Sequence, residues 1–182
     1  THFLETLPQK EMRSGLAEML KHGLIRDKIY WEQFLDLTTL NFNDLDVLIY
    51  HSIEIKNEIV QQDPTENGIR KALTFGHTLG HGIESHFLDT EKQLLHGEAI
   101  AIGMILESYL SKEKGLLTNE EYQQIKSTIS DIFDTFEFSA NDIINIQNLL
   151  IHDKKNEHGK VQFALLDGIG KCIINQSVDK EL

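Results

Sequence analysis

The 182-residue sequence predicts a mainly α fold, a multi-helical domain with one small C-terminal β-hairpin. Proline, which interrupts helices, occurs only at Pro8 and Pro64. Apolar residues recur at helical spacing along most of the chain, and a strand-like pattern appears only after Val161. We found no internal repeat and no linker, so we expect residues 1–182 to form a single domain.

Three helices are expected in the first third of the chain. Pro8 suits the first turn of a helix, because the N–H that it lacks would be unpaired there. A short second helix is expected over 28–35, and a third over about 43–62. The apolar positions expected to face the core are Met12, Leu16, Met19, Leu20 and Leu24 in the first helix, and Leu45, Leu48, Ile49, Ile53, Ile59 and Val60 in the third.

The middle of the chain begins with a turn over 63–68, which is rich in turn-forming residues. Two helices are expected next, over 69–87 and 97–114, and Gly115 would end the second. Thr118 and Glu121 form a capping-box pattern that opens a further helix to about Phe133.

The last elements are one helix and the hairpin. Ser139 or Asn141 is expected to open the helix, which ends near His152. Two strand-like runs, 161–166 and 171–174, flank a turn over 168–170 and predict the hairpin.

Charge and composition exclude several classes of partner. The chain has 29 acidic and 17 basic residues, a formal charge of -12, which repels nucleic acid and anionic membranes. No apolar run approaches the roughly 18 residues of a membrane span. The lone Cys172 excludes an internal disulfide and fits a reducing compartment, so we expect a cytoplasmic protein.

Three histidines lie close together in the sequence: His77, His81 and His96. The first two are four residues apart, so on a helix they share one face. A pair of this kind also occurs in helices that only pack tightly, but a third histidine and nearby acidic residues favour a metal site, since neutral imidazole is a common zinc ligand. The surrounding glycines are unfavourable in an exposed helix and predict close approach by another helix or a ligand: Gly76, Gly80, Gly82 and Gly97.

A candidate acidic ligand lies near the N-terminus. Glu18 falls between Leu16 and Met19, close to the apolar face of its helix. A buried carboxylate is costly unless it is paired or bound to metal, although Glu18 could equally be a partly exposed helix residue. The nearby cations could form a local anion site or remain solvated surface charges: Lys21, Lys56, Arg70, Lys154 and Lys155. Spacing alone therefore indicates a metal enzyme that handles an anion.

Five stretches in order carry a family resemblance. They are Thr6-Leu-Pro8 with Gly15-Leu-Ala-Glu18-Met-Leu-Lys21-His-Gly23, Lys56 with Glu66-Asn-Gly-Ile-Arg70, Phe75-Gly-His77-Thr-Leu-Gly-His81, Leu95-His96-Gly-Glu98-Ala-Ile-Ala-Ile-Gly-Met104, and Asp153-Lys154-Lys155 with Gly168-Ile-Gly170. Together they resemble the C-terminal domain of the 3-dehydroquinate synthase family, in the sugar-phosphate cyclase superfamily, over essentially the whole chain.

The resemblance implies a reaction and its cofactors. Such enzymes convert 3-deoxy-D-arabino-heptulosonate 7-phosphate to 3-dehydroquinate and phosphate, a step of the shikimate pathway. They do so through transient NAD-dependent oxidation, phosphate elimination, reduction and aldol ring closure, with Zn²⁺ or Co²⁺ bound. This sequence has no Gly-x-Gly-x-x-Gly turn, so NAD would be bound by an N-terminal domain absent from it. The full-length family member is expected to be a homodimer, and this chain alone is expected to fold without turnover.

The resemblance also assigns residues by motif position. The metal ligands would be Glu18, His77 and His96, and the anionic sugar phosphate would be the substrate. Catalytic roles would fall to His81, Lys21 and Glu66. The substrate contacts would be Lys21, Lys56, Arg70, Thr74, His81 and one of Lys154 and Lys155; Thr74 stands where the family usually has Asn. Two alternatives stay open: a related cyclase of the deoxyinosose or valiolone synthase type, and a non-catalytic helical binding module.

Overall fold

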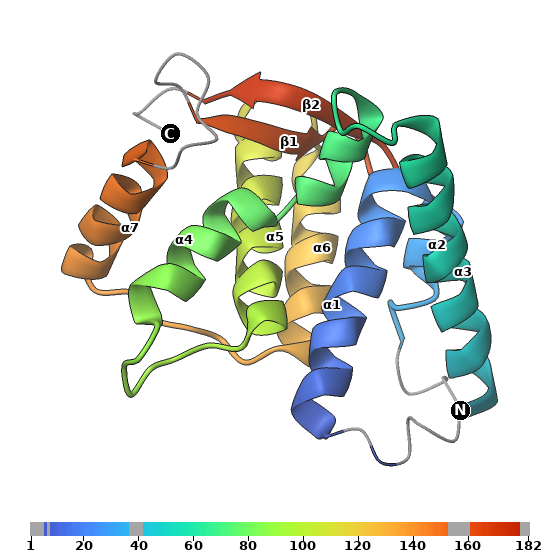
Figure 1. The fold of residues 1–182 in the computed structure, drawn as a ribbon, viewed down its shortest axis with the longest axis horizontal. Helices are drawn as coiled ribbons and strands as arrows, with labels where there is room; N and C mark the ends of the chain where they lie inside the picture. The colour runs from blue at the N-terminus through green and yellow to red at the C-terminus, as the bar shows by residue number, and fades with distance from the viewer. Residues whose placement is uncertain (1–5, 7, 37–41, 153–160, 179–182) are drawn as a thin grey trace.

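The computed structural model describes residues 6, 8–36, 42–152 and 161–178, and in this part of the chain it confirms the mainly helical fold with one hairpin (Figure 1). The elements in order are α1 (Gln9–Arg26), α2 (Lys28–Glu32), α3 (Phe42–Gln62), the 3₁₀ helix η3 (Ile69–Thr74), α4 (His77–Phe87), α5 (His96–Glu113), α6 (Asn119–Ile132), α7 (Ala140–His152), β1 (Gln162–Leu166) and β2 (Cys172–Ser177).

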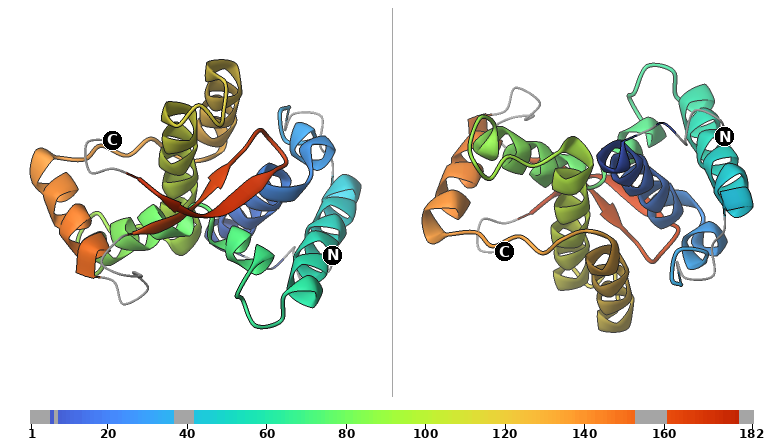
Figure 2. Two further views of the ribbon diagram at one scale, coloured as in Figure 1. Left: turned by 90° about the horizontal axis from the view of Figure 1, so that it is seen from above. Right: turned by 90° about the horizontal axis from the view of Figure 1, so that it is seen from below.

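The helices α1, α5 and α6 stand side by side, and the hairpin lies across one end of them (Figures 1 and 2). Helix α4 crosses α5 on one face, and α7 packs on the far side of α4. Helices α2 and α3 cover α1 at the opposite edge. The α4–α5 crossing therefore lies near the middle of the molecule.

The N-terminal helices follow the sequence prediction closely. Helix α1 begins directly after Pro8 and ends at Arg26. The carboxylate of the next residue, Asp27, accepts the Tyr30 N–H at 3.0 Å and so caps α2. Helix α2 ends at Glu32, earlier than predicted. Tyr30 and Trp31 are fully buried and anchor this corner.

One predicted core face is partly wrong. In α3, Leu48 and Ile59 are buried as expected, but Ile53 is 59% exposed and Ile55 is buried in its place. Helix α3 has apolar residues on two faces and packs against α1 and η3 through one of them. The amphipathic pattern alone did not identify which face this is.

The single helix predicted over 69–87 is also wrong, because the chain breaks at Gly76. Residues before the break form η3, and α4 starts at His77. Gly76 has a φ of +78°, in the left-handed region that favours glycine, and a Cβ there would lie 2.5 Å from Met104 Cγ. The break turns the chain so that His77 lies at the N-terminus of a new helix.

The predicted close approaches at the glycines are confirmed, and in each case the neighbour is another helix. A Cβ on Gly80 would lie 2.8 Å from Ile100 Cδ1 in α5, and one on Gly97 would lie 2.3 Å from Ser14 Cα in α1. Gly103 in α5 is tighter still, because its Cβ would lie 2.0 Å from the Gly76 carbonyl oxygen. The glycines therefore bring the backbones of α1, α4 and α5 together.

The C-terminal elements lie where they were predicted, but β2 runs to Ser177, beyond the predicted end at 174. Thr118 and Glu121 form the reciprocal capping box that opens α6. Strands β1 and β2 pair antiparallel, and Gly168 and Gly170 adopt positive φ between them. The Gly170 N–H donates to the Leu24 carbonyl at 2.8 Å, which joins the hairpin turn to α1.

The buried side chains form one main cluster and two smaller ones. The main cluster joins α1, α2, α3, α5, α6 and the hairpin. One smaller cluster joins α4 to α7 through Ile83, Phe87 and Ile146, with Phe136 and Phe138 packed against them. Across the residues that the structure describes, no helix combines the length and apolarity needed to span a bilayer.

Candidate metal and anion site

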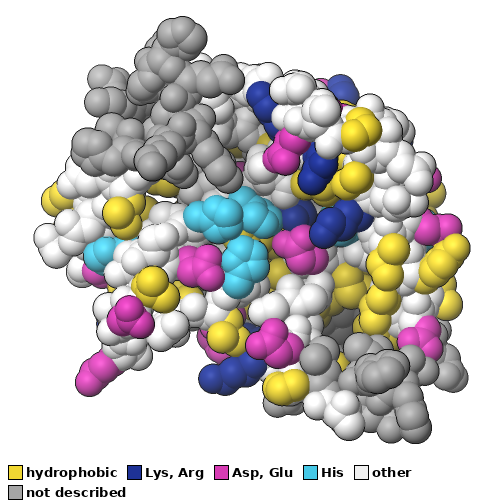
Figure 3. Space-filling model, viewed as in Figure 1, with side chains coloured by type: hydrophobic (Ala, Val, Ile, Leu, Met, Phe, Trp, Pro, Cys, Tyr) yellow, Lys and Arg dark blue, Asp and Glu magenta, His cyan; other side chains and the backbone are white. Residues whose placement is uncertain are grey.

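Three imidazoles meet where α4 crosses α5. His77 begins α4, His81 follows one turn later, and His96 begins α5. Their candidate ligand atoms all lie within 4.8 Å of one another, and the ring centroids of His77 and His81 are 5.2 Å apart. Figure 3 shows the histidine side chains gathered on one face of the molecule, next to lysine, arginine and carboxylate groups. The shared face predicted for His77 and His81 is therefore confirmed, and His96 joins them.

A carboxylate from α1 lies beside His77, outside the group of three imidazoles. Glu18 Oε1 lies 3.7 Å from His77 Nε2, and Glu18 Oε2 accepts a hydrogen bond from Lys21 Nζ at 2.7 Å. Oε1 is buried and has no hydrogen-bond partner. A buried oxygen without a donor is unfavourable, so the oxygen calls for a further positive group beside it. A divalent cation between Glu18 and the imidazoles fits this requirement.

Hydrogen bonds at the far side of two rings assign their tautomers. His77 Nδ1 lies 3.2 Å from the Phe75 carbonyl oxygen, and His96 Nδ1 lies 3.2 Å from Glu84 Oε2. Both partners are acceptors, so in each ring Nδ1 carries the hydrogen and donates it. The lone pair is then on Nε2, the arrangement that metal-binding histidines use.

The ionisation of these groups suits cation binding. Burial, and to a lesser degree the charge of Lys21, lower the pKa of His77 to about 4, so the ring is neutral at pH 7. Burial opposes ionisation of Glu18, but attraction and a hydrogen bond from Lys21 outweigh it and hold the pKa below its usual value. Glu18 is therefore a carboxylate, and the neutral imidazole of His77 lies beside it as a second donor.

Two adjoining cavities open beside these donors. The smaller, of about 220 Å³, has a wall of cations and acids; it is lined by Glu18, Lys21, Lys56, Glu66, Arg70, Leu73, Thr74 and His77. The larger, of about 410 Å³, extends past His81 toward the hairpin and shares Glu66, Thr74 and His77 with the smaller. An anionic molecule in these cavities would lie against both the cations and the metal donors.

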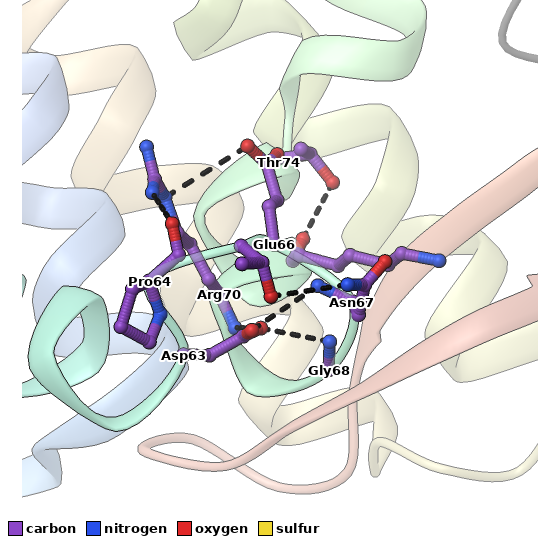
Figure 4. Close-up of polar contacts among 9 residues, drawn as sticks. Asp63, Pro64, Glu66, Asn67, Gly68, Arg70 and Thr74 are labelled. Carbon is purple, nitrogen blue, oxygen red and sulfur yellow. Dashed lines mark hydrogen bonds and ion pairs between the residues drawn. The ribbon is translucent and has the colours of Figure 1, made fainter.

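The loop between α3 and η3 is held by one carboxylate (Figure 4). Asp63 Oδ2 accepts the N–H groups of Gly68 at 2.7 Å and Arg70 at 3.1 Å, and Oδ1 accepts that of Asn67 at 3.1 Å. The Glu66 backbone has a φ of +58°, and its side-chain Oε2 lies 3.8 Å from Arg70 Nε. The loop thus places an acidic and a basic side chain together at the cavity.

Thr74 differs from an asparagine in what it presents to the cavities. Its Oγ1 donates to the Lys71 carbonyl at 2.6 Å, so the hydroxyl hydrogen is used inside η3. The oxygen can still accept a hydrogen bond, but the residue offers no free donor. Any molecule bound there must find its donors on other side chains.

The structure brings together Glu18, Lys21, Lys56, Glu66, Arg70, Thr74, His77, His81 and His96. Lys154 and Lys155 lie outside the described residues. The sequence analysis did not identify Glu84 or Asp63. Glu84 follows His81 by three residues on the same helix, and Asp63 precedes a run of turn-forming residues, so both carried a local signal that was not used.

Comparisons with known proteins identify the family of this chain. The family model described as 3-dehydroquinate synthase C-terminal matches residues 15–156. The 3-dehydroquinate synthases of Parabacteroides distasonis and Thermodesulfovibrio yellowstonii are 41% and 39% identical to this chain, each over 98% of it and over 51% and 50% of their own lengths. The chain thus spans about half the length of the curated relatives it matches.

Solved structures of related enzymes share the fold. A 2-epi-5-epi-valiolone synthase from Streptomyces hygroscopicus with NAD⁺ and Zn²⁺ bound is 25% identical, with a TM-score of 0.77 over 99% of this chain and 51% of its own. A 2-deoxy-scyllo-inosose synthase complexed with carbaglucose-6-phosphate, NAD⁺ and Co²⁺ is 25% identical, with a TM-score of 0.71 over 94% of this chain and 49% of its own. From the family model and these likenesses, the chain belongs to the 3-dehydroquinate synthase C-terminal family.

Proposed function

We propose that this chain is the metal- and substrate-binding half of a 3-dehydroquinate synthase, which converts 3-deoxy-D-arabino-heptulosonate 7-phosphate to 3-dehydroquinate and phosphate. One observation carries the proposal. The partnerless buried oxygen of Glu18 faces the Nε2 atom of His77, beside a cavity lined by Lys21, Lys56 and Arg70. Cation donors and anion-binding groups thus share one wall, as a metal enzyme acting on a phosphorylated substrate requires.

Glu18, His77 and His96 would hold the metal ion. The two assigned tautomers favour this set, since Phe75 and Glu84 fix the rings of His77 and His96 with Nε2 available. A bound divalent ion would lower the pKa of substrate hydroxyls and polarise a carbonyl. The related structures that contain Zn²⁺ or Co²⁺ support either metal.

His81 and Glu66 would handle protons near the substrate. His81 lies one turn from His77 and lines the larger cavity, where it can accept a proton from a bound molecule or return one. Glu66 lines both cavities, and its carboxylate lies 3.8 Å from the guanidinium of Arg70. Neither role requires these side chains to contact the metal.

Lys21, Lys56 and Arg70 would bind the anionic groups of the substrate. Lys21 is 2% exposed, so its ammonium group has lost most of its water and is held by Glu18. Arg70 has a planar guanidinium that can pair with two oxygens of a phosphate or carboxylate. Thr74 would accept a hydrogen bond from the substrate, and Lys154 or Lys155 would add a further cation from outside the described residues.

The remaining partners follow from the family. NAD would be bound by an N-terminal domain, which agrees with the half-length match to curated relatives. We also propose a homodimer in the cytoplasm. A related cyclase of the valiolone or inosose type is less well supported, because the relatives named 3-dehydroquinate synthase reach 41% identity and those cyclases 25%. Retention of the cation donors and the cavity argues against a non-catalytic module.

The test uses His96→Ala in the intact protein, with His86→Ala as a matched control. His86 lies on α4 but pairs with Asp142, away from the cavity. We expect His96→Ala to keep its far-ultraviolet circular dichroism and to lose bound Zn²⁺ and phosphate release, whereas His86→Ala keeps both. Unchanged Zn²⁺ stoichiometry in His96→Ala would refute the ligand assignment. Phosphate release from a hexose 6-phosphate but not from the heptulosonate phosphate would instead support a related cyclase of the inosose type.

A further inference from the structure

Helix α5 carries a buried acid that has no part in the function proposed above. Among the described residues, Glu107 is the one acidic side chain with no exposed surface. A carboxylate in such a place must be matched by hydrogen-bond donors, because its desolvation is otherwise costly. Its donors therefore indicate what it does.

The donors are backbone N–H groups at the start of α4. Glu107 Oε2 accepts from Gly76 at 2.7 Å, and Oε1 accepts from Leu79 at 3.0 Å. The first N–H groups of a helix have no partner within the helix, and a side chain of the preceding residue usually supplies one. Gly76 has no side chain, so α4 has no cap of its own. Glu107 supplies the cap from the neighbouring helix.

The capped turn is the one that presents the metal donors. His77 lies between the two donor residues, and His81 follows one turn later. Gly103 in α5 packs tightly against the same turn, because a Cβ there would lie 2.0 Å from the Gly76 carbonyl oxygen. Any displacement of this turn moves His77 relative to Glu18, which is fixed on α1.

Glu107 is itself held in a rigid setting. The Ser111 hydroxyl donates to the Glu107 carbonyl at 2.8 Å and accepts the Leu166 N–H of β1 at 3.0 Å. The turn of α5 that bears the carboxylate is thus joined to the hairpin. Both Glu107 oxygens accept backbone N–H groups, which favours the ionised form; the N–H groups of Leu79, Gly76 and Thr78 oppose the rise in the pKa of Glu107 that burial causes.

We propose that Glu107 is a positioning residue, which caps α4 from the adjacent helix and thereby fixes His77 and His81 at the metal and substrate site. The expected effect on metal binding rests on the proposed function, whereas the capping of α4 does not. Glu107 touches neither the metal donors' Nε2 atoms nor the cavities, so its effect must pass through the backbone of α4.

The experiment compares Glu107→Gln with Ser108→Ala in the intact protein. Glutamine has nearly the same volume, but one of its two acceptor oxygens is replaced by an NH₂ group, so one backbone N–H loses its partner. Ser108 is the next residue, also buried, and its hydroxyl has no hydrogen-bond partner, so its removal is a matched control. Co²⁺ titration followed by visible absorption measures metal affinity, and amide hydrogen exchange measures protection at Gly76 and Leu79.

We expect Glu107→Gln to bind Co²⁺ about 10–100-fold more weakly, the range found when the groups that orient metal ligands are changed. Exchange at Gly76 or Leu79 should accelerate at least about tenfold, while Ser108→Ala matches the wild type in both measurements. If Glu107→Gln fails to fold, Glu107→Asp takes its place, because it keeps the carboxyl group but shortens the reach by one methylene.

The outcomes separate the two proposals. Wild-type exchange and wild-type Co²⁺ affinity in a folded Glu107 variant would overturn the positioning role, and so would faster exchange with unchanged affinity. If the wild-type protein binds no Co²⁺, the proposed function fails, while faster exchange in the variant would still demonstrate the cap.

Discussion

The α4–α5 crossing offers a sharp test of how the backbone contacts build the site. We consider Gly103→Ala, because a Cβ there would lie 2.0 Å from the Gly76 carbonyl oxygen and 2.8 Å from the Gly80 nitrogen. Both neighbours are backbone atoms, so the overlap cannot be relieved by rotation of a side chain. A comfortable carbon–oxygen contact is roughly 3.3 Å, which means that the two helices must separate by about 1.3 Å.

The expected loss of stability follows from two opposing effects. Alanine in place of glycine favours a helix by about 0.5–1 kcal/mol. Overpacking costs about 1–3 kcal/mol, and the upper part of that range applies when the backbone itself must shift. The free energy of unfolding should therefore fall by about 1–2 kcal/mol. For a chain of this size, that lowers the Tm by about 2–8 °C.

The displaced helix also carries His77 and His81, so Gly103→Ala should weaken Co²⁺ binding while the protein remains folded. Urea unfolding and Co²⁺ titration measure the two effects. Gly15→Ala is the control, because a Cβ on Gly15 in α1 would have no atom within 4 Å and should stabilise the protein by about 0.5–1 kcal/mol. Wild-type stability together with wild-type Co²⁺ affinity in Gly103→Ala would refute the tight crossing.

Three further changes test other parts of the site. Burial lowers the pKa of His22 to about 4, so between pH 6.5 and 4 the unfolded chain binds a proton there that the folded chain does not. As the pH is lowered through this range, the free energy of unfolding should fall by up to about 1.4 kcal/mol per pH unit. His22→Asn should flatten that slope in urea titrations at several pH values. Asp63→Asn should raise the KM for the phosphorylated substrate more than it lowers kcat, because it loosens the loop that bears Glu66 and Arg70; an unchanged KM would contradict this. Glu84→Gln should weaken Zn²⁺ binding by about 10–100-fold in calorimetry, and equal affinity would show that its contact with His96 is dispensable.

Local sequence signals were enough to predict most elements. The Thr118–Glu121 box and the glycine-rich turn before Lys171 each mark an element boundary through contacts between near neighbours. The break at Gly76 was missed because the sequence pattern does not distinguish a glycine with positive φ from a glycine that allows close packing within a continuous helix. The break is caused by residues of α5: Glu107 accepts the Gly76 N–H, and Gly103 makes room for the Gly76 carbonyl. Partners so distant in the sequence cannot be identified from local spacing.

The candidate site shows the same division. Spacing placed His77 and His81 on one face and drew attention to Glu18, but the family resemblance was needed to group Glu18 with His77 and His96. The structure brings Glu18 to His77 because Gly97 lets α1 approach the start of α5 closely. Glu107 could have been noticed, since it follows Ile100 and Met104 at helical spacing on a buried face.

The small buried cluster between α4 and α7 is separate from the main core, so α7 is attached to the rest of the molecule mainly through α4. Ile83, Phe87 and Ile146 share no buried cluster with the main core, so α7 can detach at a smaller free-energy cost than global unfolding. Amide hydrogens in α7 should then exchange with solvent through local unfolding, while those in α1 and α5 should exchange only when the whole domain unfolds. The back of the histidine-bearing helix would be uncovered in such an event, with its front still held by α5.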